Sequence, residues 1–277
     1  MNIDAHQHFW IYNPREFEWI DDSMRAIRRN FLPADLEPEL QHNNVQGSVA
    51  VQTRQTLEET RWLLSLAEQS PRILGVVGWV DLCSEKVRSQ LEEFAKHRKL
   101  VGIRHIVQSE PDERFLLRDD FLRGVSMLEE FDLAYDILIY TKHLSVAAEF
   151  VGRFPKHRFV LDHLAKPPIK DGEIESWALG MRRLASFPNV WCKLSGLVTE
   201  AHWQRWKQED IRPYLNIAVE AFGTERLMMG SDWPVCLVAG SYGRTVDVVK
   251  NFVQDLPVHS RPAVLGDNAR RFWRLRT

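Results

Sequence analysis

Short runs of apolar and β-branched residues recur along this chain, and longer segments with a helical spacing of apolar residues separate them. This alternation is typical of repeated strand–helix–strand units, which build parallel sheets. Eight strands are predicted, at residues 2–5, 47–52, 73–80, 100–106, 134–139, 158–161, 190–194 and 227–229. Most are apolar on both faces, as strands buried on both sides must be. Eight such units in 277 residues predict an α/β protein, a single-domain (β/α)8 TIM barrel.

The segments between the predicted strands support the same fold. Helical spacing is clearest at residues 57–69 and 84–97, with Ser84 expected to open the second helix. Residues 10–35 are long, aromatic and charged, and they follow the first strand, so we predict an insertion over the barrel mouth. An open doubly wound sheet is the alternative, but no glycine-rich phosphate turn follows the first strand. We therefore expect residues 1–277 to form one domain.

Charge and composition narrow the function. The chain has 36 basic and 38 acidic residues, a net charge of −2, which leaves no global field to hold nucleic acid or an anionic membrane. No apolar run approaches the roughly 20 residues that span a bilayer. The three cysteines are widely spaced and no secretory leader is visible, so we expect a cytoplasmic protein without disulfides. These features favour a small-molecule substrate, and they leave the oligomeric state open.

Polar side chains gather where the predicted strands end, and in a parallel barrel these ends share one rim. The candidates there are His6, His8, Arg54, Arg104, His105, His163, Lys166, Lys193 and Asp232. His6 and His8 are two apart on an extended segment, so their imidazoles face the same side and can share one ion or substrate. His163 and Asp232 would complete this constellation.

The remaining rim residues have two interpretations each. The four cations of the set are candidates to bind a carbonyl or carboxylate, or they form salt bridges that cover the barrel end. His105 is a candidate catalytic residue, although a lone histidine at a strand end is often part of the core. Trp10 and Trp233 flank the predicted site and are the aromatic residues expected to contact substrate.

Three motifs together resemble the lactonase branch of the amidohydrolase superfamily. They are IDAHQHFW at 3–10, LDHLAKP at 161–167 and MGSDWP at 229–234, and GIRH at 102–105 and WCKLSG at 191–196 match in the same order. The resemblance implies a (β/α)8 barrel that hydrolyses a lactone. It also implies that four residues form the active centre and are the ligands of a divalent metal such as zinc, if one is bound. These are His6, His8, His163 and Asp232.

The chain departs from the binuclear members of that superfamily at two strands. Those members use a modified lysine or a glutamate after strand four and a histidine after strand five. Here the fourth strand ends in Arg104-His105 and the fifth in Tyr140-Thr141-Lys142-His143. The resemblance therefore implies one metal at most, because relatives in this branch include both a mononuclear zinc enzyme and enzymes that act without metal.

The stretch CLVAGSY at 236–242 is more similar to the sugar-lactone members than to the pyrone-dicarboxylate members. This similarity implies a neutral aldonolactone substrate, with L-fuconolactone as the leading example. In the predicted mechanism Asp232 takes a proton from water and returns it to the departing ring oxygen. His163, His105 and Arg54, or a metal, would stabilise the charge on the carbonyl oxygen. The alternatives are an aromatic-acid decarboxylase, an aromatic or pyrone lactonase, and a non-catalytic sugar-binding barrel.

Overall fold

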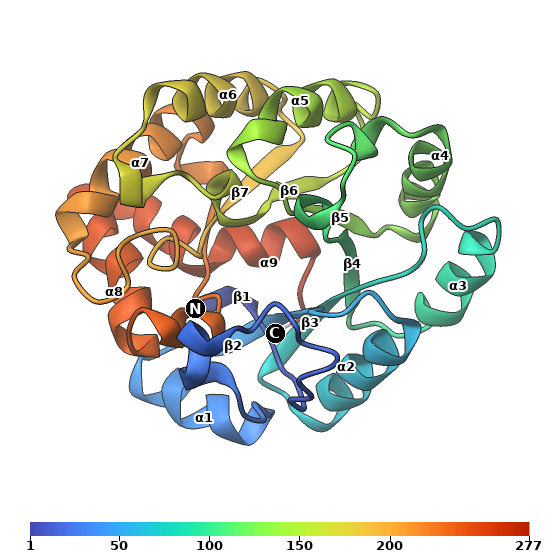
Figure 1. Ribbon diagram of the computed structural model, residues 1–277, viewed down its shortest axis with the longest axis horizontal. Coiled ribbons are helices and arrows are strands. Elements are labelled where there is room, and N and C mark those ends of the chain that lie inside the picture. The colour runs from blue at the N-terminus through green and yellow to red at the C-terminus, as the bar shows by residue number, and fades with distance from the viewer. Residues whose placement is uncertain (277) are drawn as a thin grey trace.

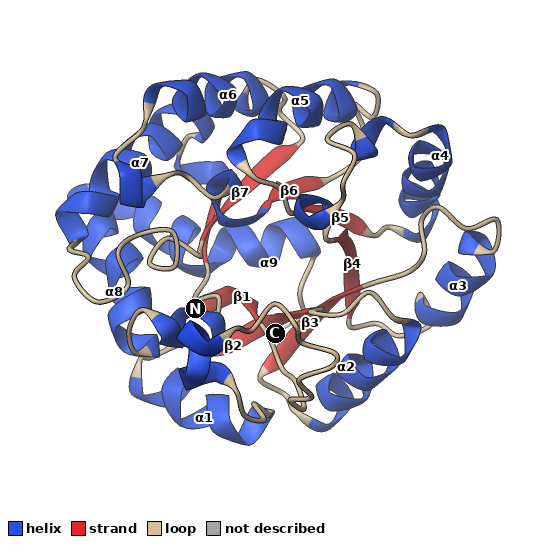
Figure 2. Ribbon diagram, in the orientation of Figure 1, coloured by secondary structure: helices blue, strands red, loops and turns tan. Residues whose placement is uncertain are grey.

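Eight parallel strands form a ring at the centre of the molecule, as the computed structural model of residues 1–276 shows (Figures 1 and 2). The strands pair in chain order, and a bridge between Gln7 and Trp233 links the two ends of the ring. They are β1 (Ile3–Gln7), β2 (Gly47–Val51), β3 (Ile73–Gly78), β4 (Leu100–His105), β5 (Ala134–Ile137), β6 (Phe159–Leu161), β7 (Val190–Leu194) and β8 (Leu227–Met229). The predicted single-domain (β/α)8 barrel is confirmed.

Helices surround the strand ring (Figure 2). They are α1 (Pro33–His42), α2 (Leu57–Gln69), α3 (Val87–Phe94), α4 (Asp119–Met127), α5 (Leu144–Gly152), α6 (Glu175–Ala185), α7 (Gln208–Phe222), α8 (Tyr242–Phe252) and α9 (Asn268–Trp273). The last helix lies across the middle of the ring in Figure 1, where Phe272 and Trp273 join Ile3, Val49 and Met228 in one buried cluster. Hydrophobic side chains of α9 therefore fill one end of the barrel.

The predicted strands are all present, with ends that differ by at most two residues. The predicted helix 57–69 is α2, but the helix predicted at 84–97 is wrong at both ends, since α3 begins at Val87 and ends at Phe94. Ser84 does not cap it, because the Ser84 hydroxyl accepts a hydrogen bond from the backbone of Lys86 at 3.1 Å. A side chain that bonds its neighbour's backbone favours a turn over a helix.

The segment between β1 and α1 has a small core of its own. Trp10 pairs with Phe31 in an antiparallel bridge, and the ring of Phe17 packs on Trp10 at 5.7 Å. The turn Asp22–Ile27 contacts the turn Val235–Val238 that follows β8. The segment thus lies against a loop at the carboxyl end of the barrel, and its role as a cover over the mouth stays a prediction.

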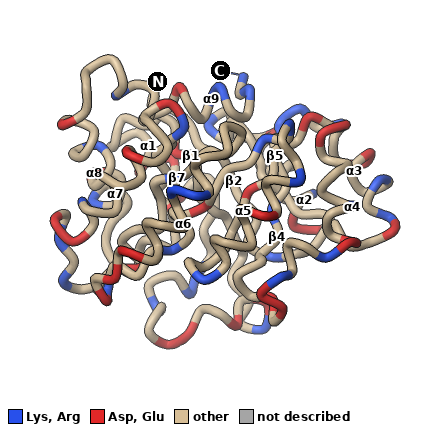
Figure 3. The backbone as a smooth tube through the Cα atoms, turned by 90° about the horizontal axis from the view of Figure 1, so that it is seen from above, with Lys and Arg blue, Asp and Glu red and all other residues tan. Residues whose placement is uncertain are grey.

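Charged side chains of both signs are interspersed over the backbone (Figure 3). Many of them pair across neighbouring helices, for example Arg182 with Glu220 at 2.9 Å. Within residues 1–276, no helix is long and apolar enough to cross a membrane.

Candidate active site

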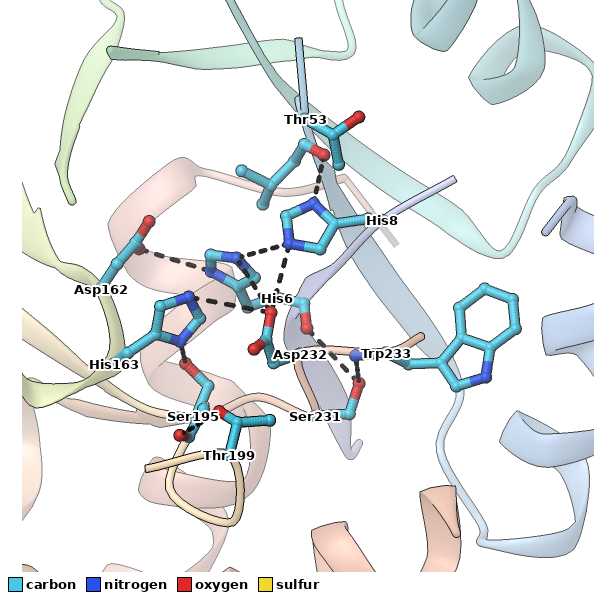
Figure 4. A network of polar contacts seen from close by, with 12 residues as sticks. His6, His8, Thr53, Asp162, His163, Ser195, Thr199, Ser231, Asp232 and Trp233 are labelled. Carbon is cyan, nitrogen blue, oxygen red and sulfur yellow. Dashed lines mark hydrogen bonds and ion pairs between the residues drawn. The ribbon is translucent and has the colours of Figure 1, made fainter. Parts of the chain in front are cut away.

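β1 brings two imidazoles together at the barrel mouth. His6 lies in the strand and His8 just after it, and their buried Nε2 atoms are 3.2 Å apart (Figure 4). The predicted approach of the two rings is therefore present. His8 Nδ1 lies 2.7 Å from the carbonyl oxygen of Val51 and donates to it, which leaves the lone pair on Nε2.

Asp232, directly beyond β8, closes the cluster. Its Oδ1 lies 3.2 Å from Nε2 of His8, 3.9 Å from Nε2 of His6 and 3.8 Å from Nε2 of His163. All four side chains are nearly fully buried. The structure thus unites the four residues that the sequence placed in the active centre (Figure 4).

A tight turn holds Asp232 in place. Asp232 has a left-handed backbone, with φ of 58°, and its N–H donates to the carbonyl oxygen of His6 at 2.8 Å. The buried Asp4 carboxylate accepts from the backbone N–H and the hydroxyl of Ser231, at 2.8 and 2.6 Å. Asp4 therefore fixes the turn that carries Asp232, a role that sequence reasoning did not assign although Asp4 belongs to the first motif.

His163 is presented by an unusual left-handed turn. Residues 163–166 all have φ between 52° and 57°, a conformation that costs non-glycine residues roughly 1–2 kcal/mol each. The turn is held from outside, because the indole of Trp177 donates to the carbonyl of Leu164 at 2.7 Å and the hydroxyl of Thr141 donates to the next two carbonyls. Surrounding hydrogen bonds thus oppose the backbone strain that aims His163 at Asp232.

The loop after β7 fixes the orientation of the His163 ring. The hydroxyl of Ser195 lies 2.8 Å from His163 Nδ1. Gly196 follows with φ of 65°, and a Cβ at that position would lie 2.6 Å from the same nitrogen. Only glycine lets the backbone approach the imidazole this closely.

Burial sets the charge states of the cluster. Burial lowers the pKa of His163 to about 4, against the opposing effect of Asp232. Burial and the charge of Lys193 hold the pKa of His6 well below its usual range. Burial would raise the pKa of Asp232, but the three histidines lower it below its ordinary value. At neutral pH a carboxylate therefore faces the uncharged imidazoles of His6 and His163, an arrangement that suits a divalent cation.

These residues fit one metal ion. The ligand atoms of His6, His8 and Asp232 all lie within 4.8 Å of one another, and two imidazoles with a carboxylate are ligands that zinc accepts. A second set, His6 with Asp162 and His163, is equally compact. There the guanidinium of Arg104 lies 3.0 Å from Asp162 and 3.3 Å from His6, so a fixed cation already balances this carboxylate. The geometry accommodates a single metal.

A buried charged layer supports His6 from below. Lys193 Nζ lies 3.1 Å from His6 Nδ1 and 2.9 Å from Asp162, and it also contacts Asp136. Lys193 and Arg104 were predicted to bind substrate, but their side chains are 0% and 2% exposed. They lie beneath the histidines because the strands direct them into the barrel, and we infer that they position His6. A charged residue inside an apolar strand, as Asp136 is, was the missed signal for this layer.

The structure leaves two predicted catalytic residues outside the cluster. His105 Nε2 bonds Glu110 at 2.7 Å, and its ring stacks on Phe115. Neighbours in a strand face opposite sides, so the inward Arg104 sends His105 outward. The guanidinium of Arg54 is engaged by two carboxylates, those of Glu59 at 2.7 Å and Glu16.

The two predicted binding tryptophans also point elsewhere. Trp10 donates its indole N–H to the carbonyl of Arg29 at 2.9 Å, within the core of the segment after β1. Trp233 packs edge-on against Phe31, and Figure 4 shows its ring directed away from the histidines. Both are almost fully buried, because a large aromatic ring is stabilised by packing into the nearest hydrophobic core. Among the predicted substrate-binding residues, Lys166 alone has an appreciably exposed side chain.

A parallel barrel with a histidine pair at β1, a histidine after β6 and an aspartate after β8 defines a class of barrel hydrolases. Residues 3–275 match the family model described as amidohydrolase, and the chain belongs to that family. It is 40% identical over 286 residues to the L-fucono-1,5-lactonase of Burkholderia multivorans, covering 99% of this chain and 96% of the relative. It is 42% identical to the L-fucono-1,5-lactonase of Burkholderia ambifaria, covering 87% and 83%. The crystal structure of a B. multivorans amidohydrolase with bound zinc superimposes over the full length of both chains, with a TM-score of 0.97 and 39% identity.

Proposed function

We propose that this protein hydrolyses a sugar lactone to its aldonic acid, with L-fucono-1,5-lactone as the leading substrate. The observation that carries the reaction type is the contact of the Asp232 carboxylate with the Nε2 atoms of three histidines, at 3.2 to 3.9 Å. The substrate class is supported by the two relatives of 40% and 42% identity that are named L-fucono-1,5-lactonase.

Asp232 is the group that moves the proton. Its lowered pKa keeps it ionised at neutral pH, so it can accept a proton from the water that attacks the lactone carbonyl. The same carboxyl then returns that proton to the ring oxygen as the acyl–oxygen bond breaks. The product is one hydroxy acid, formed by addition of one water. When a divalent metal is held by His6, His8 and Asp232, it supplies acidification of the water and polarisation of the carbonyl.

His163 is placed to stabilise the developing oxyanion. Its pKa of about 4 leaves it neutral at pH 7, and the Ser195 hydroxyl can donate to its Nδ1. The Nε2–H, which faces Asp232, can then donate to the carbonyl oxygen as negative charge grows there. The buried Arg104 adds a positive potential beneath the same site.

The cellular setting that we propose is the cytoplasm. In residues 1–276 the three cysteines Cys83, Cys192 and Cys236 are free thiols, which suits a reducing compartment. A small-molecule substrate also agrees with the nearly neutral net charge.

A pH-indicator assay tests the function directly. The panel holds L-fucono-1,5-lactone, its 1,4 isomer, L-rhamnonolactone, a pyrone lactone and aromatic acids, each with and without chelator treatment of the enzyme. We expect acid release from the sugar lactones, faster than spontaneous opening. CO₂ release from an aromatic acid would instead identify a decarboxylase. Silence on every sugar lactone contradicts the proposal.

A further inference from the structure

A pocket of about 510 Å³ opens between the loops that follow β6 and β7. Lys166 and Pro168 line it from the first loop, and Thr199, Glu200 and Trp203 line it from the second. Its volume lies within the range of small-molecule sites. Polar groups and one indole meet there, a combination that suits a sugar.

Lys166 and Glu200 form the polar centre of this pocket. Nζ of Lys166 lies 3.4 Å from Oε1 of Glu200, and the side chains are 21% and 24% exposed. Both side chains are therefore partly held by the surrounding protein and partly accessible to a ligand. At 3.4 Å the pair is loose, so both groups retain hydrogen-bonding capacity for a third partner.

The pair is tied to the histidine cluster by the backbone. Lys166 is the last residue of the left-handed turn that begins at His163. Glu200 belongs to the loop whose Ser195 bonds the His163 ring, and its carbonyl accepts from the backbone N–H of Lys170 at 3.0 Å. Burial raises the pKa of Glu200, although the ammonium of Lys166 opposes this shift. Lys166 and Glu200 therefore belong to the same two loops that present and orient His163.

We propose that Lys166 and Glu200 bind the hydroxyl groups of the lactone and set the preference for polyhydroxylated, uncharged lactones. This inference rests on the proposed function. The ammonium donates to a hydroxyl oxygen and the carboxylate accepts from a hydroxyl, so together they match a polyol. Their charges cancel, and the pocket therefore gains nothing from a substrate carboxylate, whereas an unpaired lysine would attract one.

Two variants, Lys166→Met and Glu200→Gln, test the assignment. Each is assayed with L-fucono-1,5-lactone, with δ-valerolactone, which has the same ring and no hydroxyls, and with an anionic lactone, D-glucaro-1,4-lactone. Where turnover of δ-valerolactone is too slow to follow, its inhibition constant against the sugar lactone replaces it. Lys142→Met is the matched control, because Lys142 forms a comparable but exposed ion pair with Glu113. Circular dichroism of each variant establishes folding.

Both pocket variants should raise KM for L-fucono-1,5-lactone by roughly tenfold or more and leave δ-valerolactone within about twofold, since lost hydroxyl contacts penalise only the hydroxylated substrate. Glu200→Gln should also raise the relative rate on the anionic lactone. Equal changes on all three lactones, or none, would overturn the inference. If wild-type enzyme opens no sugar lactone, the proposed function fails instead.

Discussion

Oδ1 of Asp232 lies 3.2 Å from Nε2 of His8, although the two residues are 224 positions apart in the chain. Two backbone hydrogen bonds bring them together, from His8 N–H to the carbonyl of Trp233 and from Asp232 N–H to the carbonyl of His6. These bonds join the residues after β8 to those of β1. The two sides of the candidate site are therefore brought together by the closure of the barrel itself.

Replacing Asp232 by asparagine should abolish catalysis without unfolding the protein. Asparagine has nearly the same shape but cannot accept the proton of the attacking water, so we expect kcat to fall by roughly 10³-fold or more. Initial rates on the sugar lactone and far-UV circular dichroism check both parts. Asp255→Asn, at an exposed ion pair with Arg212, is the control. Near-normal turnover of Asp232→Asn would contradict the mechanism.

Gly196→Ala should lower kcat far more than a glycine-to-alanine change at a similar backbone conformation outside the site. The new Cβ would lie 2.6 Å from His163 Nδ1 and must push the ring from its place. Gly172→Ala is the matched control, because Gly172 has a similar φ of 71° and nothing within 4 Å of its Cβ position. We expect the control to lose about 1 kcal/mol of stability and no activity. If Gly196→Ala lost no more kcat and no more of its denaturant midpoint than Gly172→Ala, the steric argument would be refuted.

Lys193→Met should destabilise the fold strongly. Lys193 is fully buried between two carboxylates, Asp136 and Asp162, and its removal leaves uncompensated negative charge in the interior. The expected loss is about 3–5 kcal/mol in the free energy of unfolding, measured by urea titration. Arg182→Met breaks the exposed pair with Glu220 and should cost less than about 1 kcal/mol. If Lys193→Met lost as little stability as this control, the buried charged layer would contribute little to the free energy of unfolding.

His157 should make the protein sensitive to acid. Burial lowers its pKa from 6.5 to about 4, so the unfolded chain binds the proton first as the pH falls. This neutral histidine therefore disfavours folding below pH 6.5, by on the order of 3 kcal/mol once the pH reaches 4. His157→Phe should narrow the difference in unfolding free energy between pH 7 and pH 5. An unchanged difference would exclude His157 as the origin.

Much of the fold was predictable from local pattern. Apolar runs located every strand to within two residues. A strand buried on both faces contains few polar residues, so it appears in the sequence as a nearly continuous apolar run. The two-residue spacing of His6 and His8 also predicted their shared side, since side chains alternate along extended backbone. Even here β1 departs from strict alternation. Its register shifts between Asp4 and Gln7, and Asp4 bonds Ser231 rather than joining the histidines.

The orientation of the other rim residues could not be predicted in this way. Arg104 and His105 are adjacent, so only one can face inward, and the packing of β4 between its neighbours selects Arg104. Arg54 follows its strand as His8 does, yet carboxylates from α2 and from the segment after β1 hold it outside the cluster.

The sequence by itself therefore determined the barrel, the order of its strands and the four residues that cluster in the candidate site. Only the tertiary structure decided that Lys193 and Arg104 lie beneath His6, that Trp233 belongs to a core, and that Glu200 stands beside Lys166. The physical reason is one of range. Hydrophobic periodicity is a local pattern that neighbouring residues form. The direction of a charged side chain instead depends on partners that the folded chain brings from distant strands and loops.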